Sequence, residues 1–184
     1  ADNQAAAQSA LERALELDKS LADAYWQRGV LRRRQRAVLD AEKDLLRALE
    51  LRPSRFQAYA TLAEVYEDQQ KWPAANLAWS KAIAADGQRA QWRFRYGKLL
   101  SSGPDRAGAL THLTEAVRLG TIMQPPPAWM GEACLLLADA ERVAGKKPEA
   151  IEHYERFLSL APVDSPYRKD ALAALRSLGA GPPP

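Results

Sequence analysis

The fold is decided by four octapeptides, at 7–14 (AQSALERA), 41–48 (AEKDLLRA), 75–82 (ANLAWSKA) and 109–116 (ALTHLTEA). They begin 34 residues apart, carry Ala at both ends, and place a large apolar residue fifth: Leu11, Leu45, Trp79 and Leu113. A fixed period of this length, filled by two helices per unit, is typical of a helical solenoid. Such a fold offers a long curved surface, so we expect binding before catalysis.

Composition sets wide bounds on the function. The chain has 184 residues, of which 47% are hydrophobic and 27% charged, in the range of globular proteins. It contains no apolar run long enough to span a membrane and does not open on a signal peptide. The formal net charge of +3 comes from 26 basic and 23 acidic residues dispersed among each other, which by itself says little about nucleic acid.

The period predicts one all-α, right-handed superhelical solenoid of antiparallel helix pairs over residues 1–178. Pro53 and Pro162 end second helices, Asp105 is a candidate helix cap, and Asp164-Ser165-Pro166 reads as the start of a last helix with Pro in its first position. We expect the second helix of a truncated repeat (1–21), repeats at 22–55, 56–89, 90–123 and 131–163, a capping helix (164–178), and a Gly/Pro tail (179–184).

The repeat slips once. The step from Ala109 to its counterpart Ala150 is 41 residues, and the seven extra residues fall around Gly120 to Pro127. We interpret the slip as a longer loop followed by a first helix at about 128–144, with an added turn at its start. The loop, which contains Pro125 to Pro127, serves as a spacer, a hinge or a contact site.

The units resemble tetratricopeptide repeats. The matching residues are the aromatics Tyr25 and Tyr59, the small residues Gly29, Ala63, Gly97 and Ala138, the alanines at 41, 75, 109 and 150, and Leu45, Trp79, Leu113 and Tyr154. The resemblance covers nearly the whole chain. Arg28 and Arg32 depart from it, because they replace large apolar residues. The Ala- and Arg-rich composition is typical of a GC-rich bacterial genome.

The resemblance implies a concave groove lined by the first helix of each repeat, in which a protein partner lies. Carried over to this sequence, the groove comprises Trp26, Val30, Arg33, Arg34, Glu64, Glu67, Asp68, Gln91, Phe94, Lys98, Leu135, Asp139 and Arg142. Trp26 and Phe94 are the candidate anchors, since aromatic residues are enriched at binding hot spots. The alternative is that both pack against neighbouring helices.

The densest charge cluster is Arg28, Arg32, Arg33, Arg34 and Arg36. It is either an anion site for phosphate, acidic peptide or nucleic acid, or a solvated face whose charges are neutralised internally. We favour the second interpretation, because Arg33 and Arg34 would lie opposite Glu64, Glu67 and Asp68 on the next first helix.

No catalytic motif is present, and we expect no enzymatic activity, metal or cofactor. His112 and His153 are the two histidines, and the repeat places both on a solvated helix face. Cys134 has no cysteine to pair with, which fits a reducing compartment, and is expected to be a small buried hydrophobe.

The sequence therefore predicts a non-catalytic interaction module that holds a peptide or helix of a partner protein within a larger scaffold. Two alternatives stay open: anion or nucleic-acid binding through the Arg28–Arg36 cluster, and self-association through the repeat ends. The cytoplasm is the expected compartment, with the periplasm or attachment to a lipoprotein as alternatives.

Overall fold

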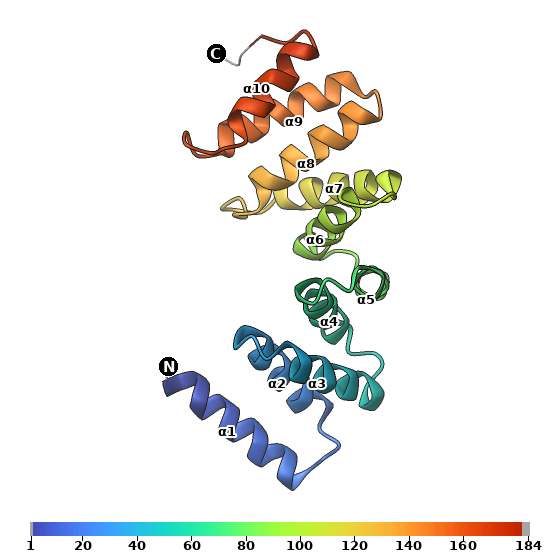
Figure 1. Ribbon diagram of the computed structural model, residues 1–184, viewed down its shortest axis with the longest axis vertical. Helices are drawn as coiled ribbons and strands as arrows, with labels where there is room; N and C mark the ends of the chain where they lie inside the picture. Colours follow the sequence, from blue (N-terminus) through green and yellow to red (C-terminus); the bar gives the residue numbers. More distant parts are fainter. Residues whose placement is uncertain (1, 182–184) are drawn as a thin grey trace. The chain divides into compact units, whose positions relative to one another are not determined.

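The computed structural model describes residues 2–181, with side chains from Gln4 onward. Within this range the chain forms ten α-helices and no strand, and the helices pack in consecutive pairs (Figure 1). The all-α fold predicted from the period is therefore confirmed. The last three residues of the expected Gly/Pro tail, 182–184, and residue 1 lie outside the described range. The chain divides into two compact units, Ala1–Gly87 (unit 1) and Gln88–Pro184 (unit 2).

Unit 1 contains one helix followed by two helix pairs. Its helices are α1 (Asp2–Leu17), α2 (Ala22–Arg34), α3 (Val38–Leu51), α4 (Phe56–Asp68) and α5 (Trp72–Ala85). The closest packing lies within the pairs α2/α3 and α4/α5, and each pair also packs on the helix before it.

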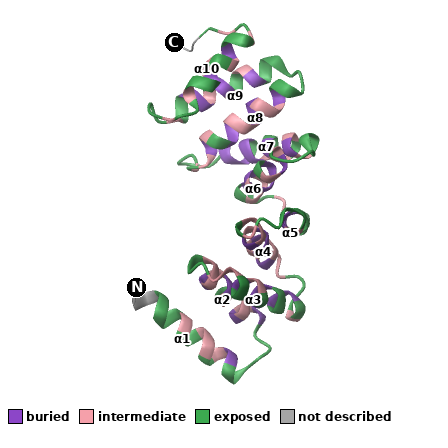
Figure 2. Ribbon diagram, in the orientation of Figure 1, coloured by how far each residue is buried: buried purple, intermediate pink, exposed green. Residues whose placement is uncertain are grey.

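The octapeptides of α3, α5 and α7 (Arg106–Thr121) supply the buried side of these second helices, whereas α1 is mostly exposed or half-buried, as Figure 2 shows by colour. Ala41, Leu45 and Ala48 of α3 are 0% exposed, and Ala75, Trp79 and Ala82 of α5 are the same. The small residues let a first helix approach closely. A Cβ atom added to Gly29 would lie 2.8 Å from Cγ of Leu45, so even one methyl group does not fit there.

The turns inside three of the helix pairs end the first helix in the same way. Arg36, Gln70 and Gly145 occupy equivalent places and have φ angles of 65°, 59° and 77°. In each turn the next residue donates a backbone hydrogen bond back over five residues, as from Lys71 to the carbonyl oxygen of Tyr66. This is a Schellman ending, for which glycine is the usual residue.

Unit 2 contains the pairs α6 (Ala90–Ser101) with α7 (Arg106–Thr121) and α8 (Met130–Val143) with α9 (Lys147–Leu160), followed by α10 (Arg168–Ser177). Its core includes Phe94, Leu113, Cys134, Leu137 and Tyr154. The Asp105 side chain accepts a 2.8 Å hydrogen bond from the Gly108 N–H, which confirms the predicted cap of α7.

The seven extra residues lie mainly in the loop, as expected. Compared with α5, α7 runs two residues further, and the loop that follows has eight residues in place of four. The remaining residue lengthens the start of α8, which is less than the added turn predicted there.

The predicted start of the last helix is wrong by two residues. Helix α10 begins at Arg168 without a side-chain cap, and Pro166 lies in the preceding turn, closed by a 3.2 Å bond from the Arg168 N–H to the Ser165 carbonyl oxygen. The Arg168 guanidinium instead donates to the carbonyl oxygens of Leu158 and Ala161, at 2.6 and 3.1 Å. The first residue of α10 therefore supplies hydrogen bonds to carbonyl groups at the C-terminal end of α9.

Candidate partner-binding faces

The predicted groove residues lie on the first helices of the pairs, α2 and α4 in unit 1 and α6 and α8 in unit 2. We call the residues of α2 and α4 in this set the unit 1 face: Trp26, Val30, Arg33, Arg34, Glu64, Glu67 and Asp68. The unit 2 face comprises those of α6 and α8: Gln91, Phe94, Lys98, Leu135, Asp139 and Arg142.

Arg33 connects the two helices of the unit 1 face. Its Nη1 pairs with Oε2 of Glu64, and its Nε donates to Oδ2 of Asp68 at 2.7 Å. The pairing expected between the arginines and the acids of the next first helix is therefore confirmed for Arg33. Arg34 is exposed, and Glu67 accepts a 2.5 Å hydrogen bond from Nε1 of Trp79.

Trp26 is half-buried and already has partners in unit 1. Its Nε1 donates to Oγ1 of Thr61 at 3.4 Å, and the Arg55 guanidinium lies 4.1 Å from its ring centroid. A cation over the face of an indole is an attractive contact. Trp26 therefore contributes to the packing between α2 and α4, with part of its surface left to solvent. Val30, one turn further along α2, is also half-buried.

On the unit 2 face, Phe94 is in the core. It is 6% exposed and stacks on Trp129, with ring centroids 5.2 Å apart and planes 12° from parallel. This is the packing role that the sequence left open beside the anchor role. Gln91 is exposed, and Leu135 is half-buried against the same core.

The polar residues of the unit 2 face form two small networks. Nζ of Lys98 on α6 pairs with Oε1 of Glu132 on α8 at 2.6 Å. Further along α8, Oδ1 of Asp139 accepts a 2.5 Å hydrogen bond from the Tyr154 hydroxyl, which accepts another from Nε of Arg142 at 3.1 Å. These contacts orient charged groups of both signs while leaving them partly exposed.

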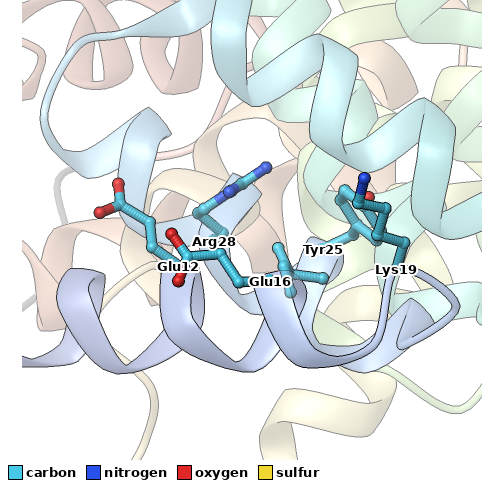
Figure 3. A pocket seen from close by; sticks show the side chains of 6 residues that line it. Glu12, Glu16, Lys19, Tyr25 and Arg28 are labelled. Carbon is cyan, nitrogen blue, oxygen red and sulfur yellow. The ribbon is translucent and has the colours of Figure 1, made fainter.

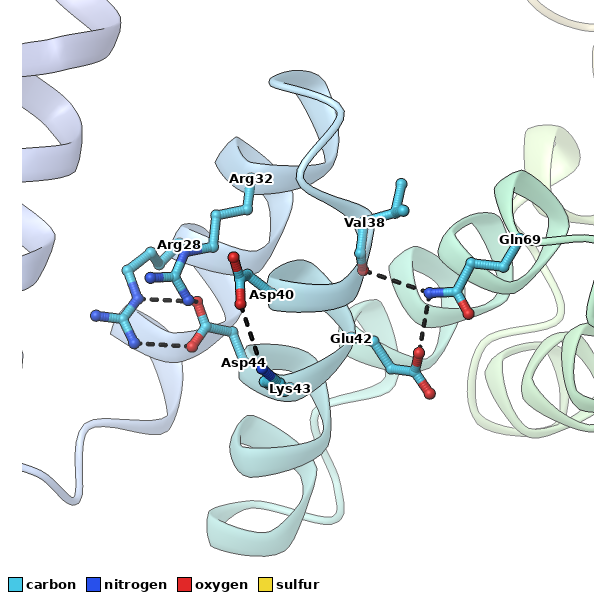
Figure 4. A network of polar contacts seen from close by, with 8 residues as sticks. All are labelled: Arg28, Arg32, Val38, Asp40, Glu42, Lys43, Asp44 and Gln69. Atoms are coloured by element: carbon cyan, nitrogen blue, oxygen red, sulfur yellow. Dashed lines mark hydrogen bonds and ion pairs between the residues drawn. The ribbon is translucent and has the colours of Figure 1, made fainter.

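Two more arginines of the cluster, Arg28 and Arg32, share an acid that the sequence reading missed. Asp44 of α3 is 4% exposed and binds Nε and Nη2 of Arg28 and Nη1 of Arg32, each at 2.8 Å (Figure 4). Asp44 falls within the apolar stripe of α3, three residues after Ala41, and a lone acid in such a stripe is the signal that could have revealed it. With Arg33 also paired, three of the five arginines are in internal ion pairs, while Arg34 and Arg36 are exposed. We therefore do not expect the cluster to bind nucleic acid.

A pocket of about 370 Å³ lies between α1 and α2 in unit 1. It is lined by Glu12, Leu15 and Glu16 of α1, by Lys19 in the turn after α1, and by Tyr25 and Arg28 of α2 (Figure 3). Charges of both signs share the wall, and Arg28 is already engaged by Asp44. Such a lining does not favour one class of small ligand.

The prediction that both histidines lie on a solvated face is wrong. His112 is half-buried and lies against Tyr96, with ring centroids 4.6 Å apart and planes tilted by 45°, and its Nδ1 is 3.4 Å from Nη1 of Arg93. Burial, and after it the charge of Arg93, lowers the pKa of His112. His153 is also half-buried, and its Nδ1 lies 2.8 Å from Oε2 of the buried Glu141. Both histidines are therefore partly buried, His112 against α6 and His153 against α8.

Cys134 is a buried hydrophobe, as predicted. It is 0% exposed, and burial raises the pKa of its thiol to about 11.

Among the described residues, no three His, Cys, Asp or Glu side chains gather as metal ligands would. Over the same range, no helix is both long and apolar enough to cross a membrane.

No protein-family model and no curated protein matches the sequence. Solved structures are nevertheless similar. YrrB, described as a TPR protein with an unusual peptide-binding site, has a TM-score of 0.74 and 18% identity, over 95% of this chain and 84% of YrrB. MamA has a TM-score of 0.70 and 18% identity, over 83% and 85% of the two chains. PilF of Pseudomonas aeruginosa has a TM-score of 0.62 and 24% identity, over 88% and 74%. At these identities the likeness establishes the fold.

Proposed function

Since the chain has the tetratricopeptide-repeat fold, we propose that it is a non-catalytic interaction module that holds a peptide or helix of a partner protein against the first helices of its pairs. The observation that carries the proposal is the state of the polar groups on these helices. Arg33 is held between Glu64 and Asp68, and Lys98 is held by Glu132. Their side chains are oriented before a partner arrives, which lowers the entropy lost on binding.

The chemistry of the faces indicates the kind of partner. Each face presents acids and bases side by side, with Asp68 and Arg34 exposed on one and Lys98 and Arg142 exposed on the other. A partner segment with mixed charges and polar side chains complements such a surface better than a polyanion does. The peptide-binding description of YrrB is consistent with this class of partner.

The proposal is tested by capture of partners from a lysate of the source organism on three baits. One is the wild-type chain, and one carries Arg34→Glu, Lys98→Glu and Arg142→Glu on the two faces. The matched control carries Lys43→Glu, Arg47→Glu and Lys169→Glu, which reverse the same number of positive charges on exposed residues of α3 and α10.

We expect a partner that is retained by the wild type and the control and lost by the face variant, with all three baits equally folded by circular dichroism. Retention by all three baits would move the site away from the first helices. Loss from the control alone would place it on the second helices and α10.

A further inference from the structure

A buried acid in unit 2 has no role in the faces described above. Glu141 of α8 is 4% exposed, and among the described residues the only other buried charged side chain is Asp44. A buried carboxylate is costly unless a counter-charge and hydrogen bonds compensate for the lost water. The structure therefore has to supply Glu141 with a partner.

That partner is His153 of α9. Its Nδ1 lies 2.8 Å from Oε2 of Glu141 and 3.0 Å from the backbone carbonyl oxygen of Glu149. Both neighbours are acceptors, so Nδ1 carries a proton in either charge state of the ring. The two side chains keep only 6% and 16% of their surface exposed, which shields the pair from solvent.

Taken together, the groups around His153 favour the charged form of its ring. Burial opposes the charged ring, but the hydrogen bond and charge of Glu141, together with the charge of Glu152 on α9, outweigh it, so the pKa of His153 is raised above its ordinary value of 6.5. The cations on the adjoining helices are engaged elsewhere: Arg168 of α10 binds carbonyl oxygens of α9, and Arg118 of α7 pairs with Glu115. Arg156, also on α9, lies near Cys134.

The pair is adjacent in sequence to the network of the unit 2 face. Arg142 follows Glu141, and Tyr154 follows His153. The Tyr154 hydroxyl joins Asp139 to Arg142, as described above. A change in the packing of α8 on α9 at this point therefore reaches three side chains of that network.

We propose that Glu141 and His153 form a proton-operated lock between α8 and α9, closed in acid and weakened at alkaline pH, which sets the rigidity of the unit 2 face. The part of the inference that concerns partner binding rests on the proposed function, whereas the lock itself does not. Because the folded chain binds the ring proton more tightly than the unfolded chain, the stabilisation is fully present below pH 6.5. It is lost as the pH rises through the higher pKa of the folded state.

The first test is the titration of His153 in the full chain, followed by its imidazole NMR signals. We expect the midpoint of the wild type to lie above that of an unstructured histidine, and Glu141→Gln to lower it. His112 serves as the internal reference and keeps its midpoint in the same variant. An unchanged His153 midpoint in Glu141→Gln would overturn the proposal.

The second test measures the lock itself, by amide hydrogen exchange of α8 and α9 in the free chain between pH 5.5 and pH 8.5. Each variant is compared with the wild type at the same pH, so the intrinsic pH dependence of exchange cancels. We expect His153→Gln to exchange several-fold faster than the wild type in acid and to approach it at alkaline pH. A constant ratio across the range would show a merely structural role and refute the lock.

A double variant guards against simple misfolding. Glu141→Arg with His153→Asp installs the residue types of Arg32 and Asp44, which occupy the equivalent positions of α2 and α3. We expect the amides of α8 and α9 in this double variant to be protected from exchange, and their protection relative to the wild type in acid not to change near neutral pH. Because all measurements use the chain without a partner, their outcome does not depend on the capture experiment.

Discussion

The helix pairs α2/α3 and α8/α9 solve the same packing problem with opposite charges. Arg32 and Asp44 lie 12 residues apart, as do Glu141 and His153, and the two sets occupy equivalent places in the repeat. In the first pair the base is on the first helix, and in the second pair the acid is. The same position of the repeat therefore accepts a buried ion pair of either polarity.

The polarity has a consequence for titration. Arginine stays charged at every pH that a protein experiences, whereas histidine changes charge near neutrality. The same position in α6/α7 holds Leu100 and His112, a histidine without an acid. Unit 2 therefore contains a histidine whose pKa is raised and one whose pKa is lowered, and α2/α3 contains none.

The largest expected effect comes from breaking the permanent pair. Asp44→Ala leaves Arg28 and Arg32 without their shared carboxylate, and we expect a loss of about 3 kcal/mol in the free energy of unfolding, measured with urea. The estimate is at the low end for a buried pair because the two guanidiniums keep some exposure, 16% and 23%. Asp40→Ala, which removes only a surface pair with Lys43, is the control and should change the stability by less than about 1 kcal/mol. Equal losses in the two variants would contradict this account.

A second comparison concerns the close approach of the helices. Where the first helix carries Gly29 or Gly97, the second helix places Leu45 or Leu113 against it; in the other two pairs Ala63 and Ala138 are combined with the flat rings of Trp79 and Tyr154. A Cβ on Gly97 would lie 2.8 Å from Cγ of Leu113. We expect Gly97→Ala to cost about 2 kcal/mol by overpacking, measured by thermal unfolding.

The combination of Gly97→Ala with Leu113→Tyr sharpens this test, because it recreates the pairing of Ala138 with Tyr154. The double variant should lose less stability than the sum of the two single variants. Simple additivity would mean that the Gly–Leu and Ala–aromatic combinations are coincidental.

The turns provide a stabilising prediction. Gln70 has a φ of 59° in the position where α8/α9 carries Gly145 at 77°. Gln70→Gly relieves the Cβ strain of the left-handed conformation and should raise the unfolding free energy by about 0.5 to 1 kcal/mol. The comparison variant is Gln69→Gly, one residue earlier at a φ of −92°, which relieves no strain, also removes the hydrogen bonds of the Gln69 amide to Val38 and Glu42, and should destabilise the protein.

The smallest effect distinguishes the two histidines. The neutral form of His112 is favoured in the folded chain, so the unfolded chain takes up a proton first as the pH falls through 6.5, and stability drops on the acid side. His112→Gln should remove that acid-side loss, whereas His153→Gln should remove a gain on the same side. The comparison fails if the two variants change the pH profile of the melting temperature in the same direction.

The sequence predicted the features that repeat, because repetition averages out local exceptions. In the octapeptides of α3, α5 and α7 the alanines and the large residues were identified as core and are buried, whereas in α1 Ala7 is exposed and Leu11 and Ala14 are half-buried. The cap at Asp105 followed from a local rule. Residues that break the repeat were read less well. Phe94 packs on Trp129, which follows the insertion at the place where the other repeats carry Ser54 and Gln88. The repeat pattern therefore gave no reason to expect an aromatic partner for Phe94.

Glu141 and Asp44 were missed for a related reason. Each lies on the apolar face of its helix, at a spacing of three from Ala138 and Ala41 respectively. The reading assigned charges to solvated faces, and partners 12 residues away on another helix become visible only when the turn between the helices is known.

Cys134 gives the protein a built-in reporter. It is the only thiol in the chain, is fully buried in α8, and has a pKa of about 11, so a thiol reagent at neutral pH finds almost no accessible thiolate in the folded state. Labelling therefore requires that the helix opens first, and its rate measures how often that happens. The kinetics of one chemical reaction on the unmodified protein thus follow the opening of unit 2 alone, since unit 1 contributes no cysteine.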